Sequence, residues 1–210
     1  MDLSGKIPVV RDQGPVRPTC LAVATTAIHE AARGDGMQRC IEYLYAKAFD
    51  ATPRTIRSQG LTWLAVAEVL EQIGQPLEGV WPYDPYGPVG AMPGDVGPVA
   101  HCRSEVRRVD SGNARAALED GFPVVLGVRI TPDWHARLEP PYVIPMREQG
   151  GLGHAVVAVG LGTDDTGELF VLIQNTWGPR WGSNGTAWLP WEYVRKHFLG
   201  YLKVEECLVD

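Results

Sequence analysis

The sequence predicts an α+β protein in which the helices come first and the strands follow. Apolar residues in the N-terminal half recur at helical spacing between capping signals, whereas the C-terminal half holds short runs rich in β-branched residues. We expect one domain over residues 1–210 with two lobes, roughly 14–98 helical and 99–210 β-rich. Sites for small ligands tend to lie in the cleft between such lobes.

Three helices are expected in the N-terminal lobe, at residues 19–34, 38–51 and 62–74. The first has Pro18 and Thr19 as start signals, an alanine-rich run and Gly34 as a stop. Residues 80–98 are rich in proline and glycine, so regular structure is not expected there. We interpret this stretch as the segment that crosses between the lobes.

The C-terminal lobe is expected to hold one short helix and five strands. The helix covers residues 114–121, and the strands cover 122–130, 153–162, 168–175, 185–190 and 201–208. The sequence TDDTG between two of these strands is typical of a hairpin turn. The densest basic group, CRSEVRR, is interpreted as a solvated strand or loop face.

The composition is that of an ordinary globular chain, with 45% apolar and 21% charged residues. A net charge of -6 argues against nucleic acid or an anionic membrane as a partner. We see neither a membrane-spanning stretch nor a signal pattern, which indicates an intracellular chain or a fragment of a longer one. The four cysteines form no C-x-x-C pair and have irregular spacing, so we expect no metal site and reduced thiols.

Cys20 stands at the start of the first predicted helix. A thiol at this position lies near unpaired backbone N–H groups and the positive end of the helix dipole, and both stabilise a thiolate. Cys20 is therefore a candidate nucleophile, with a small buried apolar residue as the alternative. A nucleophilic thiol needs a base, and the base needs a partner that orients it.

Among the five histidines, His154 is the candidate for that base. Neighbouring glycines leave room around it, and the strand that follows would hold it rigidly. A satisfied structural histidine is the alternative. His29 lies nine residues after Cys20 on the same helix and faces the opposite side, and His197 is expected at the surface. Two further histidines lie in irregular or strand-edge sequence, His101 and His135.

Asn175 ends an otherwise apolar strand, where a polar side chain needs a partner. Its amide oxygen can accept the second ring N–H of a histidine and fix the tautomer. Trp177, two residues later, could cover that bond and exclude water. Core packing is the alternative for this tryptophan.

Three blocks of sequence resemble the active-site blocks of papain-like (C1 family) cysteine peptidases. They read RDQGPVRPTCLAVAT, GGLGHAVVAVGLG and IQNTWGPRWGSNGTAWLP. Their order is Cys, His, Asn, and His154 and Asn175 follow Cys20 by 134 and 155 residues. The segments GVWPYDP and LEDGFPVVLGVRI also look like parts of the family, so the resemblance covers nearly the whole chain. It implies the papain-like two-lobe fold, with a helical left lobe, a β-barrel-like right lobe and the active-site cleft between them.

The resemblance implies a Cys20 thiolate paired with the imidazolium of His154, which Asn175 orients and Trp177 shields. Gln13 would join the backbone N–H of Cys20 in an oxyanion hole. Further positions that the resemblance places against the substrate are Gly60, Leu152, Gly153, Trp177 and Trp181.

The chain departs from the family pattern around the nucleophile. Pro18 and Thr19 precede Cys20 where the family has Cys-Gly-Ser/Ala, and Leu21 follows where the family has an aromatic residue. The missing upstream cysteine removes a family disulfide. One extra residue separates Gln13 from Cys20, which leaves the placement of the Gln13 amide open.

The implied function is a cysteine protease that hydrolyses peptide bonds through a Cys-His-Asn triad and a thioester acyl-enzyme. Its partners would be peptide or protein substrates, and no cofactor or metal is implied. The alternatives are a thioester-based transpeptidase or amidase, and a catalytically weak papain-like binding module. We expect a bacterial cytoplasmic enzyme without a pro-segment, restrained by a regulatory domain, a partner protein or narrow specificity.

Overall fold

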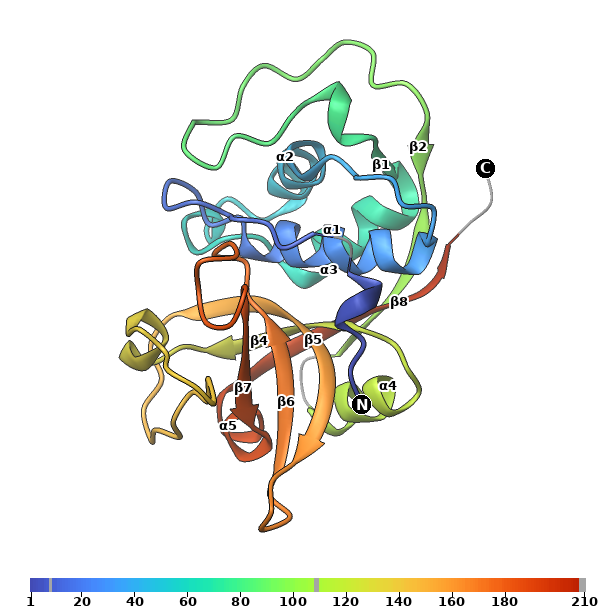
Figure 1. Cartoon of the computed structure of the whole chain (residues 1–210). Helices are drawn as coiled ribbons and strands as arrows, with labels where there is room; N and C mark the ends of the chain where they lie inside the picture. Colours follow the sequence, from blue (N-terminus) through green and yellow to red (C-terminus); the bar gives the residue numbers. More distant parts are fainter. Residues whose placement is uncertain (8, 108–109, 208–210) are drawn as a thin grey trace.

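The computed structural model describes residues 1–7, 9–107 and 110–207, and it has an α+β fold with its helices N-terminal and its sheet C-terminal. Figure 1 shows α1, α2 and α3 in the upper half and the sheet in the lower half, with α1 lying directly on the sheet. These helices are α1 (Cys20–Arg33), α2 (Ile41–Ala51) and α3 (Trp63–Glu68). The fold class predicted from the sequence is confirmed.

Helix α1 forms the centre of the molecule. It contacts α2 and α3 on one side and β4, β5 and β8 on the other. Residues 21–30 are all buried as a result. Small alanine and threonine side chains let the neighbouring elements approach closely, and Gly34 ends the helix in the left-handed conformation, with φ 61°. The predicted start and stop of this helix are confirmed.

The other two predicted helices are also present, with one change in hydrogen bonding. Thr62 caps α3 by accepting a hydrogen bond from the backbone N–H of Ala65, at 3.2 Å. After Glu68 the chain continues as a π-helical turn, Val69–Ile73, as far as Gly74. The expected single helix over 62–74 is therefore continuous in the chain but not α-helical throughout.

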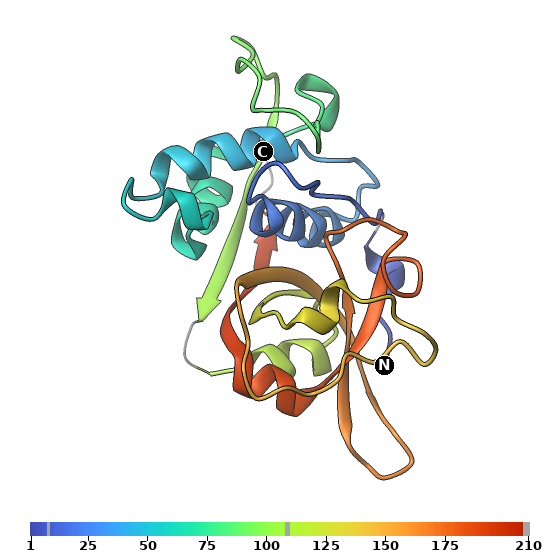
Figure 2. The ribbon, with the colours of Figure 1, turned by 90° about the vertical axis from the view of Figure 1, so that its left-hand side faces the viewer.

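Residues 80–98 hold little regular structure, as expected, but they do not cross between the two halves. A short strand before them, β1 (Gln75–Pro76), pairs with β2 (Val99–Ala100) after them, so both ends stay in the helical half. Trp81 and Val96 pack near Cys40 within that half. The crossing is made instead by β3, which follows β2 directly and is the long yellow-green strand in Figure 2.

The lower half is a six-stranded antiparallel sheet with the order β3-β8-β4-β5-β6-β7. The strands are β3 (Cys102–Arg107), β4 (Val124–Arg129), β5 (Gly153–Thr163), β6 (Leu169–Gln174), β7 (Thr186–Pro190) and β8 (Phe198–Cys207). The five predicted strands are confirmed, and the basic segment forms the sixth at one edge. Positions 108 and 208 lie outside the described residues.

Two helices accompany the sheet, α4 (Gly112–Glu119) and α5 (Trp191–His197). The predicted helix at 114–121 corresponds to α4. His197, expected at the surface, is 3% exposed. Its ring packs on Tyr193, four residues earlier on the same helical face, and its Nε2 bonds the carbonyl of Arg147 at 2.8 Å. The expectation for His197 is wrong because the inward face of α5 includes its last residue.

The antiparallel topology gathers the candidate site residues. Strand β5 begins at Gly153, and its antiparallel neighbour β6 ends at Gln174. His154 and Asn175 therefore lie at the same end of these two strands. Helix α1 packs against β5 and starts at Cys20. Within the described part of the chain, no helix has the length and apolar character needed to cross a bilayer.

Candidate active site

Cys20 is the first residue of α1 and is only partly exposed. Thr19 precedes the helix and uses no side-chain cap, so the first N–H groups of α1 remain open to an acceptor. Cys20 and His154 line the same two cavities, although they come from opposite halves of the molecule. The structure therefore brings the candidate nucleophile and the candidate base to one site.

His154 and Asn175 form a buried pair. The His154 Nε2 atom lies 2.7 Å from Asn175 Oδ1, and the two residues are 6% and 1% exposed. The same Oδ1 accepts the backbone N–H of Thr176 at 2.8 Å. An atom that accepts this N–H is an oxygen, so Nε2 of His154 is the donor. The tautomer with a proton on Nε2 leaves Nδ1 as the basic nitrogen.

Aromatic rings enclose this pair. The centroid of the Trp177 ring lies 4.8 Å from that of His154 and 4.9 Å from that of His135, and it is nearly parallel to the His135 ring at 19°. Trp134, fully buried, meets His154 edge-on at 5.9 Å. Low polarity around the His154–Asn175 bond strengthens it. His135 and Trp134 are site residues that the sequence did not reveal, because their segment carries no pattern of its own.

Burial acts on both reactive groups. It raises the pKa of the Cys20 thiol. Hydrogen bonds from the backbone N–H groups of Ala155, Leu21 and Cys20 itself lower this pKa and offset part of the rise. Burial lowers the pKa of His154 to about 4; the hydrogen bond to Asn175 opposes this change, and His135 adds to it. Each group on its own thus favours its neutral form, and a charged pair requires the two charges to offset each other.

Gln13 reaches the site through a short pairing with the segment after β6. Its backbone N–H donates to the carbonyl of Thr176 at 2.6 Å, and Asp12 bridges to Trp177. Thr176 Oγ1 also donates to Gln13 Oε1 at 2.6 Å. With Oε1 accepting this bond, the Nε2 donors are left for the cavity that Gln13 shares with Cys20. Thr176 is a further residue that sequence reasoning missed.

The longer connection between Gln13 and Cys20 is held by buried polar contacts. Arg17 donates to both carboxylate oxygens of Glu42 at 2.8 Å and to the carbonyl of Asp84 at 2.8 Å. A side chain at Gly14, which has φ 69°, would lie 1.8 Å from the Pro85 oxygen. Arg17 stands three residues before Cys20, where the family pattern has a cysteine.

Tyr83 fixes the same connection from the other side. Its hydroxyl donates to the carbonyl of Gln13 at 2.6 Å and lies 2.6 Å from Thr19 Oγ1. The two ends of the connection, at Gln13 and at the residue before Cys20, thus share one hydrogen-bonding partner. Gln13 and Cys20 line the same cavity despite the extra residue.

Two cavities open beside Cys20. The larger, about 660 Å³, is lined by Gln13, Leu152, Trp177 and His135 among others. The smaller, about 150 Å³, is lined by Gly60, Leu61, Trp63, Ala155 and Leu199 among others. Gly153 borders both.

Of the positions expected to meet a substrate, Gly60, Leu152, Gly153 and Trp177 thus line a cavity. Trp181 lines neither: its ring stacks on Trp134 at 5.8 Å and its Nε1 donates to the Trp134 carbonyl at 2.8 Å. The Trp181 ring therefore supports Trp134, which is one of the aromatic rings around His154. Leu152, by contrast, is 81% exposed at the rim of the larger cavity.

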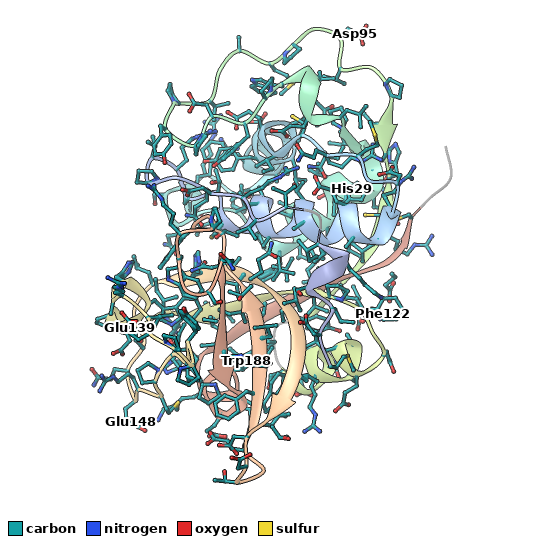
Figure 3. All side chains as sticks on the ribbon, in the orientation of Figure 1. His29, Asp95, Phe122, Glu139, Glu148 and Trp188 are labelled. Carbon is teal, nitrogen blue, oxygen red and sulfur yellow. The ribbon has the colours of Figure 1, made fainter. Side chains whose placement is uncertain are left out.

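His29 lies away from this site. His29 sits on the helical side of α1, as Figure 3 shows, and its Nδ1 bonds Gln75 at 2.9 Å. Its predicted direction, away from Cys20, is confirmed. No group of three or more His, Cys, Asp or Glu side chains in the described residues is arranged to hold a metal ion.

Known proteins resemble this chain in sequence. The family described as papain family cysteine protease matches residues 100–195. A cathepsin B-like protein of Giardia intestinalis, CP3, is 31% identical over 196 residues, which are 85% of this chain and 63% of that protein. Chymopapain of Carica papaya is 56% identical over 34 residues, 16% of this chain and 9% of its own. The chain spans less than two thirds of the length of these relatives.

Solved structures share the fold. Xylellain, a cysteine protease from Xylella fastidiosa, superposes with a TM-score of 0.76 at 24% identity, covering 94% of this chain and 82% of its own. The bromelain protease from Ananas comosus has a TM-score of 0.70 at 18% identity and covers 97% of both chains. The two kinds of comparison agree: residues 100–195 match the papain family of cysteine proteases, and nearly the whole chain has the fold of these cysteine protease structures.

Proposed function

We propose that the chain hydrolyses peptide bonds in peptide or protein substrates through a Cys20–His154–Asn175 triad. The observation that carries this proposal is the 2.7 Å bond from His154 Nε2 to Asn175 Oδ1 beside a cavity that Cys20 also lines. That bond leaves the Nδ1 lone pair free to take the thiol proton. Gln13 supports the proposal because its amide donors and the helix N-terminus at Cys20 border the same cavity.

The reaction begins with attack of Cys20 Sγ on the substrate carbonyl carbon, while the thiol proton passes to Nδ1 of His154. The carbonyl oxygen becomes an oxyanion, which the backbone N–H of Cys20 and Nε2 of Gln13 stabilise. When this intermediate collapses, the C–N bond breaks and the amine takes the proton from His154. His154 then removes a proton from water, which attacks the thioester and releases the acid and the Cys20 thiol.

The smaller cavity is proposed to take a small apolar side chain from the acyl side of the scissile bond. Its lining includes the apolar side chains of Leu61, Trp63 and Leu199. Gly60, with φ 113°, borders it and leaves room for the substrate backbone. The larger cavity, with Leu152 and Trp177, is proposed to take the leaving-group side.

The test is labelling with the epoxide inhibitor E-64, located by mass spectrometry. The bromelain structure that shares this fold is itself a complex with E64. We expect one adduct, on Cys20, in the wild type and in the matched control His101→Ala. We expect no adduct in Cys20→Ala, and labelling slowed by roughly 100-fold or more in His154→Ala, because the thiol then lacks its base. A thermal melt checks that each variant is folded.

Labelling that ignores His154, or that falls on another cysteine, would contradict the triad. Products from a fluorogenic peptide then define the reaction. Free acid and free amine as the only products are expected for hydrolysis. Acyl transfer to an added amine in preference to water would assign the chain to transpeptidation, and labelling without turnover would assign it to binding.

A further inference from the structure

Cys102 and Cys207 face each other across two neighbouring strands, although they are 105 residues apart in the sequence. They are direct partners in the register of β3 and β8. Opposed residues in an antiparallel pair have Cα atoms about 4.5–5.5 Å apart. A disulfide needs its two Cα atoms about 4.4–6.8 Å apart. The Cα spacing in this register is therefore within the range in which a disulfide forms.

The two thiols differ in their access to solvent. Cys102 is fully buried, whereas Cys207 is partly exposed and lines a cavity of about 220 Å³ with Lys6, Phe122 and Glu205. A small reagent that enters this cavity can reach Cys207 first. Figure 1 shows that β8 ends at the outer edge of the molecule.

The thiols also differ in their acidity. The Cys102 thiol donates a hydrogen bond to Cys207, which is the main reason that the pKa of Cys207 is lowered, and it raises the pKa of Cys102. Burial opposes the lowering at Cys207. Arg33 and Arg39 add to it, and Asp35 opposes it. The exposed thiol is thus the better nucleophile and the buried thiol is its neighbour, which is the arrangement that disulfide formation requires.

We propose that Cys102 and Cys207 form a redox site that closes into a disulfide in the presence of a small disulfide oxidant such as glutathione disulfide. The Cys207 thiolate attacks one sulfur of the oxidant, and one glutathione thiolate leaves. The Cys102 thiol gives up its proton and attacks the Cys207 sulfur of this mixed disulfide, and the second glutathione thiolate leaves. The two protein thiols are oxidised, and one glutathione disulfide is reduced to two glutathione molecules.

A disulfide between Cys102 and Cys207 would fix the last part of β8 to β3. Strand β4 pairs with β8 only as far as Leu202, so the described residues beyond it, 203–207, pair with β3 alone. Because β3 also leads up to the helical half, the bond would join the end of the sheet to the strand that connects the two halves. The closed segment contains the whole sheet, so the unfolded chain would lose much of its freedom.

This site is independent of the proposed active site. Cys20 lines two other cavities, and none of their lining residues is Cys102 or Cys207. The sequence alone suggests reduced, widely spaced thiols. The pairing becomes visible only because β3 and β8 lie side by side.

The test equilibrates the full chain with glutathione buffers of increasing oxidation, blocks the remaining thiols and maps the peptides by mass spectrometry. The same series on Cys20→Ala separates the result from the proposed peptidase. We expect in both proteins a peptide pair linked through Cys102 and Cys207, with Cys40 still blocked as a free thiol. We expect the Tm of the linked form to exceed that of the reduced form by about 5–15 °C.

Cys207→Ala is the informative variant, because this side chain is partly exposed and its loss should leave the fold intact. It should show neither the link nor the oxidant-dependent rise in Tm, and Cys40→Ala should show both. Three results would overturn the proposal: glutathione retained on Cys207 without the link, a link between other cysteines, or free thiols at both positions in the most oxidising buffer.

Discussion

Trp63 and Gly127 together set the size of the smaller cavity. A Cβ atom at Gly127 would lie 2.5 Å from Cζ2 of Trp63, so β4 can pass beneath this ring only because it has a glycine there. In the proposed function, this ring is part of the wall that a substrate side chain meets beside Cys20. We expect the large Trp63 ring and the missing side chain at Gly127 to limit the size of the substrate side chain that this cavity admits.

Trp63→Leu should widen the preference of the acyl-side pocket. Removing ring atoms opens space next to Gly127, so a leucine side chain of the substrate can enter where alanine was preferred. We expect the ratio of kcat/KM for leucine over alanine to rise by roughly 10-fold or more, since each methylene in such a pocket discriminates by about 1–3 kcal/mol. Fluorogenic peptides varied at each acyl-side position measure this ratio.

The matched control is Trp188→Leu, because Trp188, labelled in Figure 3, lies on β7 and lines neither cavity. It should retain the wild-type preference. If Trp63→Leu changes kcat/KM equally for all peptides, the ring supports the fold and does not select the substrate.

At the scale of elements, the connection before α1 depends on a buried ion pair. The Arg17 and Glu42 side chains are 8% and 2% exposed, and Arg17 also lies over the rings of Tyr45 and Tyr83. The pair joins the connection to α2. Since Gln13 and Cys20 stand at the two ends of this connection, its geometry bears on the proposed oxyanion hole.

Glu42→Gln should lower both stability and turnover. The variant leaves a buried guanidinium without its counter-charge, which costs about 3–5 kcal/mol of unfolding free energy. The double variant Arg17→Met/Glu42→Leu removes both charges and should recover most of this loss, but not kcat, because the connection is no longer held. Urea unfolding and peptide turnover measure the two effects separately.

Glu119→Gln is the control for this comparison, because it breaks the exposed Arg115–Glu119 pair on α4. Such a pair contributes about 0.5 kcal/mol or less, so stability and kcat should stay near wild type. A double variant with full turnover would show that the ion pair has no part in positioning Gln13.

At the scale of the whole molecule, local sequence patterns predicted the helices and strands, but they did not predict which distant segments pair with each other. The cap at Gly34 and the apolar runs of the sheet are patterns of consecutive residues, so the sequence alone predicts the helix and the strands that contain them. The β1–β2 pairing was not predicted, and the segment between these strands was therefore expected to cross. His135 meets Trp177 only through the fold. The proposed triad positions were indicated by helix and strand patterns together with family resemblance, and they come together through the packing of α1 on β5 and the pairing of β5 with β6.

Three buried titratable groups make stability depend on pH. Burial lowers the pKa of His29 and of His154 from 6.5 to about 4. The unfolded chain thus binds more protons between pH 6.5 and 4, and the unfolding free energy falls as pH falls through this window. Burial raises the pKa of Glu30 from 4.5 to about 7 despite its ion pair with Arg11. Its contribution has the opposite sign, because it is lost as pH rises through 7.

His29→Leu isolates one of these contributions. His29 is fully buried in the helical half, and its Nε2 has no hydrogen-bonding partner among the residues that the structure describes. Between about pH 7 and pH 4.5 the wild type should lose more unfolding free energy than the variant, by roughly 2–3 kcal/mol, because only the wild type must keep this imidazole neutral. Urea unfolding at several pH values gives the slope. Gln75→Leu is the matched control: it breaks the same hydrogen bond yet keeps the imidazole, so it should lose absolute stability while its pH slope stays as steep as that of the wild type or becomes steeper. Equal slopes in His29→Leu and the wild type would mean that His29 is not the buried group that acid must protonate, and that the loss of stability in acid arises elsewhere, with His154 as the next histidine to replace.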